Sequence, residues 1–230
     1  MARAASYLAD KAAAAWGAMF ANYSRAAVNF SSVEVLFETV VPRDPVVFIG
    51  WHEANVLTLV LHGRLFPRPA IAFVPPGLAG AAMRGWLEAL DIAPVALAPD
   101  ARRGLGLRQM RSALAAGKDV LIAVDGPKGP RHAIAPGALW LARASGAAII
   151  PVGCAASLCF RLPRWDRLVV PLPGAHAAGV VGGPWACEGA WTSKEALDRL
   201  AAQLHRLTRR AQDALSTRLM PVQKEVVPWP

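Results

Sequence analysis

Short apolar runs alternate with amphipathic stretches along most of the chain. The apolar runs have the length and β-branched composition of buried strands. They cover residues 33–41, 46–50, 70–76, 93–99, 121–124, 147–157, 168–172 and 177–182. Helical periodicity is found at 52–65, 79–90, 105–117, 137–146 and 192–219. This alternation predicts a single-domain α/β layered sandwich, with a mostly parallel central sheet flanked by helices.

The first part of the chain is Ala-rich and carries one apolar stripe. The stripe consists of residues three or four apart, namely Leu8, Trp16, Met19, Phe20, Tyr23, Ala27 and Phe30. This spacing predicts an N-terminal amphipathic helix over 1–30, which either packs on its own domain or lies in a membrane interface. The polar face has few cations, so both alternatives stay open. An α/β domain over 31–220 and a Pro-rich tail over 221–230 follow, and Thr192 or Ser193 is the expected N-cap of the last long helix.

Composition and charge favour a lipid partner over a nucleic acid. Hydrophobic residues make up 54% of the chain, and 25 Lys and Arg against 16 Asp and Glu give a formal charge of +9. A basic surface attracts phosphate groups of nucleic acids, lipid headgroups or phosphorylated carriers. Aromatic residues are not interleaved with Arg and Lys as in single-strand binders. We therefore expect no nucleic-acid partner.

The same composition argues against several other classes. No run approaches the roughly 20 nearly uninterrupted apolar residues of a transmembrane helix, and we expect neither such a helix nor a signal peptide. The cysteines are three in number and lack C-x-x-C spacing. This pattern favours buried thiols over a disulfide framework or a zinc site.

Two polar motifs directly follow apolar strands. Trp51 and His52 come after the run that ends at Gly50, and the segment DGPKGPR occupies 125–131. Both motifs could open on the same carboxyl edge of a parallel sheet, where such folds bind ligands. The second is a Gly/Pro-rich loop with backbone N–H groups and two cations, which suits an anion. Phosphate-binding P-loop, dinucleotide-binding and Ser-hydrolase motifs are all missing.

Four segments together resemble a known superfamily. They read GWHEANVLTL, RRG with its following helix, AVDGPKGPRHAIAPGALWLARASGAAIIPVG, and RWDRLVVPLP. These segments resemble the lysophospholipid acyltransferase superfamily, in particular a bacterial subgroup catalogued as a domain of unknown function and similar to the lipid A late acyltransferases. The resemblance covers roughly residues 33–185. Its specific part is the block from DGPKGPR to IIPVG.

The resemblance implies roles for individual residues. His52 would be a general base toward an acceptor hydroxyl, in a superfamily where an aspartate five residues later orients the histidine. The second segment would supply Arg102, Arg103 and Gly104, the third would supply Asp125, Gly126 and Arg131, and the fourth would supply Pro151. Phosphate binding is expected from Arg102, Arg103, Lys128 and Arg131, and Trp51 and Asn55 would join Pro151 around the pocket. No metal or cofactor is implied, because the thioester donor is already activated.

The chain departs from the superfamily pattern at the orienting position. Leu57 stands five residues after His52, where the superfamily has aspartate. Three replacements remain open. Glu53 would point away from the base if the segment is helical, Asn55 lies on the right face but is uncharged, and Asp125 serves only if the two loops converge. The subgroup commonly lacks this aspartate, and we expect His52 and Asp125 to lie on one rim, within about 10 Å.

The remaining candidate side chains are expected to be structural. They are His62, His132, His176, His205, Trp165 and Asp166, with His132 as the reserve candidate for the site. The sequence leads to one functional hypothesis and one rival. The hypothesis is a peripheral acyltransferase on the cytoplasmic side of the inner membrane, moving a fatty acyl group from acyl carrier protein or CoA to a hydroxyl of a lysophospholipid or lipid A-like glycolipid. The rival, favoured by Leu57, is a non-catalytic lipid- or partner-binding protein on the same fold.

Overall fold

A seven-stranded sheet forms the centre of the computed structural model, which describes residues 2–96, 103–185 and 193–217. The strands follow the order β1-β9-β6-β2-β5-β3-β4. Their bounds are β1 Ser32–Phe37, β2 Val47–Gly50, β3 Ala70–Val74, β4 Ile92–Ala96, β5 Asp119–Ala123, β6 Ile149–Ala156 and β9 His176–Val181. All neighbours pair in parallel except β6 and β9. The predicted α/β sandwich with a mostly parallel sheet is confirmed.

A small antiparallel ribbon stands apart from this sheet. It pairs β7 (Cys159–Arg161) with β8 (Val169–Pro171). The strand at 168–172 was expected, whereas β7 falls in a stretch whose polar and Trp-containing pattern predicts irregular structure. Below, the β7–β8 hairpin means residues 157–171.

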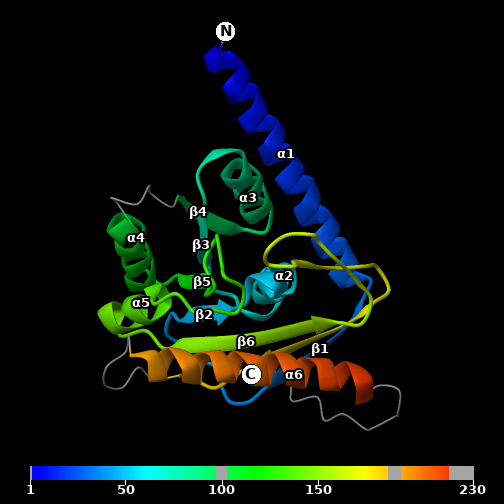
Figure 1. Ribbon diagram of the computed structural model, residues 1–230, viewed down its shortest axis with the longest axis vertical. Coiled ribbons are helices and arrows are strands. Elements are labelled where there is room, and N and C mark those ends of the chain that lie inside the picture. The colour runs from blue at the N-terminus through cyan, green and yellow to red at the C-terminus, as the bar shows by residue number, and fades with distance from the viewer. Residues whose placement is uncertain (1, 97–102, 186–192, 218–230) are drawn as a thin grey trace.

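Helices cover both faces of the sheet (Figure 1). Their bounds are α1 Ala2–Asn29, α2 Asn55–Leu65, α3 Gly77–Ala89, α4 Arg103–Ala115, α5 Gly137–Ser145 and α6 Lys194–Thr217. Successive side chains of a strand point to opposite faces of the sheet, so neighbouring residues of β2 pack into different layers. Phe48 joins the core cluster of α1, α2 and α3, whereas Val47 and Ile49 join that of α4, α5 and α6.

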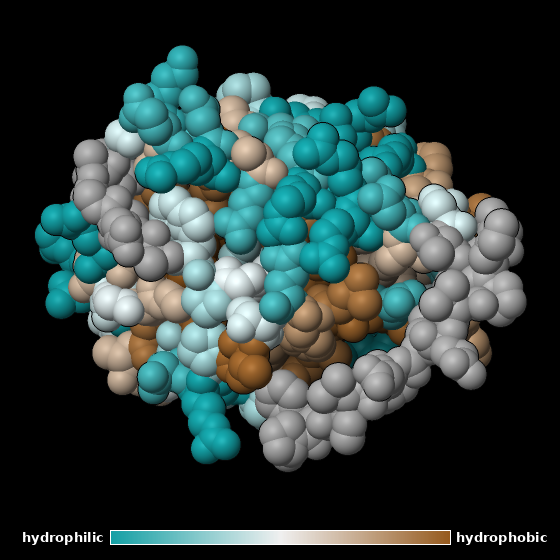
Figure 2. All heavy atoms as spheres, turned by 90° about the horizontal axis from the view of Figure 1, so that it is seen from below, coloured by the Kyte–Doolittle hydropathy of each residue, from teal (hydrophilic) through white to brown (hydrophobic). Residues whose placement is uncertain are grey.

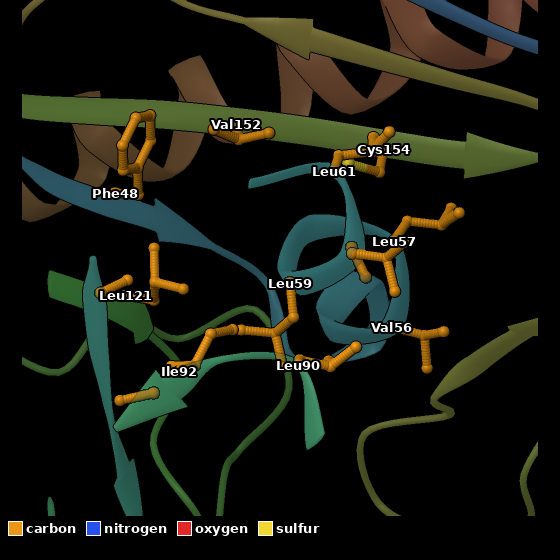
Figure 3. Packing of buried hydrophobic residues seen from close by; sticks show 14 of the residues in the cluster. Phe48, Val56, Leu57, Leu59, Leu61, Leu90, Ile92, Leu121, Val152 and Cys154 are labelled. Atoms are coloured by element: carbon orange, nitrogen blue, oxygen red, sulfur yellow. The ribbon is translucent and has the colours of Figure 1, made fainter. Parts of the chain in front are cut away.

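The core beneath α2 is continuous and apolar (Figure 3). Leu57 and Leu61 of α2 lie in one cluster with Phe48 of β2 and with Val152 and Cys154 of β6. Leu57 is 1% exposed. The position five residues after His52 is therefore occupied by a core residue.

The N-terminal helix both packs on the domain and leaves an apolar face uncovered. Gly17 of α1 lies so close to α3 that a Cβ built on it would be 1.7 Å from the carbonyl oxygen of Ala82. Gly85 of α3 approaches Ala14 of α1 in the same way. The predicted stripe is divided: Phe20 and Ala27 face the core. Its other members are exposed, namely Leu8, Trp16, Met19, Tyr23 and Phe30.

The last helix covers the opposite layer. The side-chain hydroxyl of Ser193 accepts a hydrogen bond from the backbone N–H of Ala196 at 3.2 Å, which confirms Ser193 as the N-cap. Gly153 of β6 lies directly under Leu207 and Thr208 of this helix. The outer face of α6 is largely hydrophilic (Figure 2). The end of the predicted strand at 97–99, the alternative cap Thr192 and the tail over 221–230 lie outside the described residues.

Candidate functional site

The register of β2 and β5 brings His52 and Asp125 together. Gly50 of β2 pairs with Ala123 of β5, and the backbone N–H of Val124 donates to the carbonyl of Gly50 at 3.0 Å. His52 and Asp125 each follow this pair by two residues. The two side chains therefore leave the carboxyl edge of the sheet side by side, and the expectation that they share one rim is confirmed.

Asp125 is bonded to His52 twice. Its Oδ1 lies 2.8 Å from Nδ1 of the His52 ring and also accepts the backbone N–H of His52 at 3.0 Å. Its Oδ2 accepts a hydrogen bond from the backbone N–H of His132 at 3.3 Å, which ties the end of the 126–131 loop to the carboxylate. The Asp125 side chain is 0% exposed and that of His52 is 16% exposed. The carboxylate is thus fixed within the protein, whereas the imidazole reaches the surface.

The environment of Asp125 favours its charged form. Burial alone raises the pKa of this carboxyl, but the hydrogen bonds from the His52 ring and from the two backbone N–H groups outweigh burial and lower it below the ordinary value. An ionised carboxylate only accepts hydrogen bonds, so Nδ1 of a neutral His52 must carry the proton. The lone pair then lies on Nε2, the nitrogen that faces away from Asp125.

Glu53 belongs to a separate group of charges. Its carboxylate contacts Nη2 of Arg131, lies 3.1 Å from Nε2 of His132 and 3.6 Å from Nη1 of Arg161. Glu53 therefore does point away from His52, and Asp125 is the carboxylate that contacts the imidazole. Arg131 was predicted to bind phosphate. Its guanidinium pairs with the carboxylate of Glu53 and is 32% exposed, so it links the 126–131 loop to the start of α2, and phosphate binding by Arg131 stays a prediction.

The loop after Asp125 takes its shape from glycine and is covered by an aromatic ring. Gly126 has φ +67° and Gly129 has φ +69°, values that strain other residues. A Cβ on Gly129 would lie 2.7 Å from the Trp165 ring. The same indole packs edge-on against His52, with 5.1 Å between ring centroids. Trp165, which comes from the β7–β8 hairpin, thus forms one wall of the site.

Of the three residues predicted to line the pocket, Trp51 and Pro151 are buried and Asn55 is half-buried beside His52. Trp51 is 1% exposed and packs against the rings of His132 and His205, so its indole faces the core rather than a membrane or an open pocket. Pro151 is buried in β6 beside Ile49. Asn55 opens α2, and its backbone N–H bonds to the carbonyl of His52.

A cavity of about 330 Å³ adjoins Glu53 instead, at the carboxyl end of β6 between α2, α6 and the hairpin. Leu57 and Val169 give it an apolar part, whereas Arg161 and Gln212 give it a polar part. This cavity is therefore lined by residues on the Glu53 side of the candidate site. The sequence offered no signal for it, because α6 and the hairpin reach it only through the tertiary fold.

The predicted phosphate-binding residues are only partly placed. Lys128 is exposed on the loop between Gly126 and Gly129. Arg103 and Gly104 lie in the first turn of α4, and Arg102 lies outside the described residues. Lys128 is the cation of this set that the structure shows exposed beside the His52–Asp125 pair.

Residues 2–96, 103–185 and 193–217 contain neither a candidate metal site nor a candidate membrane-spanning helix. No cluster of three or more His, Cys, Asp or Glu side chains there could hold a metal ion. None of the helices in those ranges has the length and apolar character needed to cross a bilayer.

Comparison with known proteins adds one distant relative. No family model matches the chain. A protein of Rickettsia prowazekii (strain Madrid E), described as "Uncharacterized protein RP090", is 28% identical over 141 residues. The matched stretch covers 61% of this chain and 64% of the relative. The name of this relative states no activity, so a functional assignment has to be argued from the residues of the site.

Proposed function

We propose that the chain is an acyltransferase that moves a fatty acyl group from an acyl thioester to a lipid hydroxyl. The observation that carries this proposal is the 2.8 Å contact between Nδ1 of His52 and the buried Asp125 carboxylate. It supplies an oriented base although Leu57 replaces the usual aspartate. The resemblance of the surrounding segments to the lysophospholipid acyltransferase superfamily selects this reaction among those that use a histidine base.

The reaction needs one base and no acyl group bound covalently to the enzyme. The acceptor hydroxyl attacks the thioester carbonyl while Nε2 of His52 takes its proton. Asp125 holds the ring in the tautomer with the proton on Nδ1 and stabilises the imidazolium that forms. The tetrahedral intermediate collapses by breaking the C–S bond, and the thiolate takes the proton from His52. The products are a lipid ester and the free thiol of the carrier.

Charge and surface support a membrane lipid as the acceptor. Lys128 is an exposed cation on the loop next to the base and would contact a phosphate of the acceptor or of the donor. The exposed side of α1 presents Trp16 at 70% and Met19 at 61% exposure. Aromatic and apolar side chains on one helix face suit the headgroup layer, so the proposal places the protein peripherally on the inner membrane.

The rival function, lipid or partner binding without turnover, rested on Leu57. Its force is reduced because the carboxylate of Asp125 contacts the imidazole directly although position 57 is a leucine. We therefore keep acyl transfer as the proposal and treat absence of turnover as an outcome of the test below.

Acyl transfer from labelled acyl carrier protein and labelled acyl-CoA to a panel of lysophospholipids and lipid A-like glycolipids tests the proposal. His52→Ala is expected to lower turnover by about 10² to 10⁴, the usual contribution of a general base. Asp125→Asn is expected to lower it by up to about 10⁴, because the amide no longer fixes the tautomer.

His176→Ala is the matched control, since this histidine is exposed at the start of β9. Its turnover should equal that of the wild type. Wild-type protein that transfers no acyl group to any acceptor, or His52→Ala protein with unchanged rates, would contradict the proposal.

A further inference from the structure

The outer face of the β7–β8 hairpin is apolar and uncovered. Leu158 is 53% exposed and Phe160 is 55% exposed. Phe160 lies in β7 and Leu158 lies in the bend directly before that strand, so both exposed side chains belong to the start of the hairpin. Arg161, on the other face, reaches inward to the buried carboxylate of Glu53. An outward face of a ribbon is ordinarily polar, so its apolar residues indicate a partner.

The hairpin is attached to both the base and the N-terminal helix. Trp165, between its two strands, packs against His52. The hydroxyl of Tyr23 in α1 donates to the backbone carbonyl of Pro171 at 3.0 Å. Figure 1 shows the hairpin and the end of α1 side by side. The hairpin therefore lies against the second half of α1, next to the carboxyl edge of the sheet.

The charge of the hairpin complements an anionic surface. Arg161, Arg164 and Arg167 lie within it, and Asp166 is its acidic residue. Asp166 is buried and bonded to Arg164 and to the backbone of Leu168. Arg164 is 54% exposed even so. The exposed charge of the hairpin's own side chains is therefore positive, which suits anionic lipid headgroups.

We propose that the β7–β8 hairpin is a second membrane-docking element, which inserts Leu158 and Phe160 among lipids and places Arg164 and Arg167 at anionic headgroups. This inference rests on the proposed acyl transfer at a membrane surface and adds how the protein is oriented on that surface. The hairpin carries Trp165 against His52, so docking holds the mouth of the site at the lipid surface. The opposite layer, where α6 presents a largely hydrophilic face, points away from the lipid (Figure 2).

Vesicle flotation of the full chain tests the docking element. The double variant Leu158→Ser and Phe160→Ser should partition at least about tenfold less into vesicles of phosphatidylcholine with 30% phosphatidylglycerol, on the order of the effect of two exposed apolar side chains. Val40→Ser is the matched control. Val40 is 84% exposed but follows β1, which runs opposite to β2 and so ends at the other edge of the sheet. Its binding should match the wild type.

A second pair of variants tests the charge. Arg164→Gln with Arg167→Gln should weaken binding to the anionic vesicles but not to pure phosphatidylcholine, and added salt should remove the difference. Arg199→Gln with Arg209→Gln removes the same net charge from two exposed positions of α6 and should weaken vesicle binding less. Equal effects of the two pairs would mean that the net charge of the protein acts alone, which overturns the headgroup assignment.

The outcomes separate this inference from the proposed enzymatic function. If Trp16→Ser with Met19→Ser abolishes flotation while the hairpin variant floats normally, α1 is the anchor and the inference about the hairpin is overturned. If wild-type protein does not float with either vesicle, docking is overturned, although acyl transfer to acceptors in detergent micelles would still support the enzyme. Thermal melting of each variant shows that lost binding is not lost folding.

Discussion

The carboxylate that contacts the His52 imidazole comes from the loop after β5 and not from the helix that follows His52. Asp125 follows β5, whereas Leu57 lies within α2 and packs into the core between that helix and β6. A carboxylate at position 57 would lie in apolar surroundings instead of serving the base. The carboxylate beside His52 is therefore supplied by Asp125, across the edge of the sheet.

An aspartate at position 57 should destabilise this protein. Leu57→Asp would place a carboxylate on a side chain that is 1% exposed and lies between the apolar core cluster and the cavity lined by Arg161, at a cost of several kcal/mol in the free energy of unfolding. Chemical denaturation measures this loss, and we expect no gain in acyl transfer. Leu57→Met, a swap of similar volume, should cost less than about 1.5 kcal/mol. A Leu57→Asp protein of wild-type stability and higher turnover would contradict our account of the orienting residue.

Close contact of two helices distinguishes α1 from a free membrane helix. The backbone of Gly17 lies against Ala82, and Gly85 lies against Ala14, so each helix offers the other a surface without side chains at the crossing. Ala21 and Val28 bury further area on this side. The helix therefore supports the domain with one side and leaves the Trp16 side available for lipid. Deletion of residues 1–30 would remove both functions at once and could not tell them apart.

A larger residue at the crossing should separate the helices. Gly17→Val adds a Cβ that would lie 1.7 Å from the Ala82 carbonyl oxygen, and it should lower the free energy of unfolding by about 1 to 3 kcal/mol. Gly63→Ala is the control within α2. The nearest atom to its new Cβ would lie 3.9 Å away, so higher helix propensity should raise stability by about 0.5 to 1 kcal/mol. Equal stabilities of the two variants would refute the close α1–α3 contact.

The hydrophobic pattern of the sequence predicted the strands and helices better than the tertiary contacts between them. The seven strands of the main sheet were predicted because buried β-branched runs such as residues 46–50 are unambiguous in an alternating chain. β7 was missed because Cys159–Arg161 is too short to show a period. His52 and Asp125 could be paired in advance because both follow strands. The link from Glu53 to Arg161 depends on how a distant hairpin folds back, which no local pattern records.

Buried carboxylates stabilise both edges of the central sheet. Asp119 begins β5 at the edge opposite to Asp125 and is 0% exposed. It accepts hydrogen bonds from Arg68 and the backbone N–H of Val46, and it lies 3.1 Å from Nε2 of His62. Burial raises the pKa of Asp119, but His62, Val46 and Arg68 outweigh it and lower that pKa. One central strand thus carries an ionised, internally bonded carboxyl at each end.

These two groups should make the fold sensitive to acid. A carboxyl whose pKa is lower in the folded protein stabilises it above the pKa of the unfolded chain, near 3.8, and this contribution is lost as pH falls through the lower folded values. Stability is therefore expected to fall steeply below pH 3.8. Denaturation at a series of pH values measures the slope.

Asp119→Asn should lose about 3 to 5 kcal/mol at neutral pH and show a shallower acid limb, because one carboxyl no longer takes up a proton on unfolding. Glu88→Gln, on an exposed position of α3, is the matched control and should leave the acid limb unchanged. An acid limb of the same slope in Asp119→Asn protein would show that other groups cause the acid sensitivity.

The equal spacing of His52 and Asp125 beyond their paired residues has a consequence for how this chain can change in length. Gly50 and Ala123 are register partners, and each functional side chain follows its partner by two residues. Deleting one residue after either strand would turn one side chain to the other face and draw it back along the sheet, so the imidazole and the carboxylate would part. The tip of the 126–131 loop lies beyond both groups, so it is the place where an added residue would leave their pairing intact.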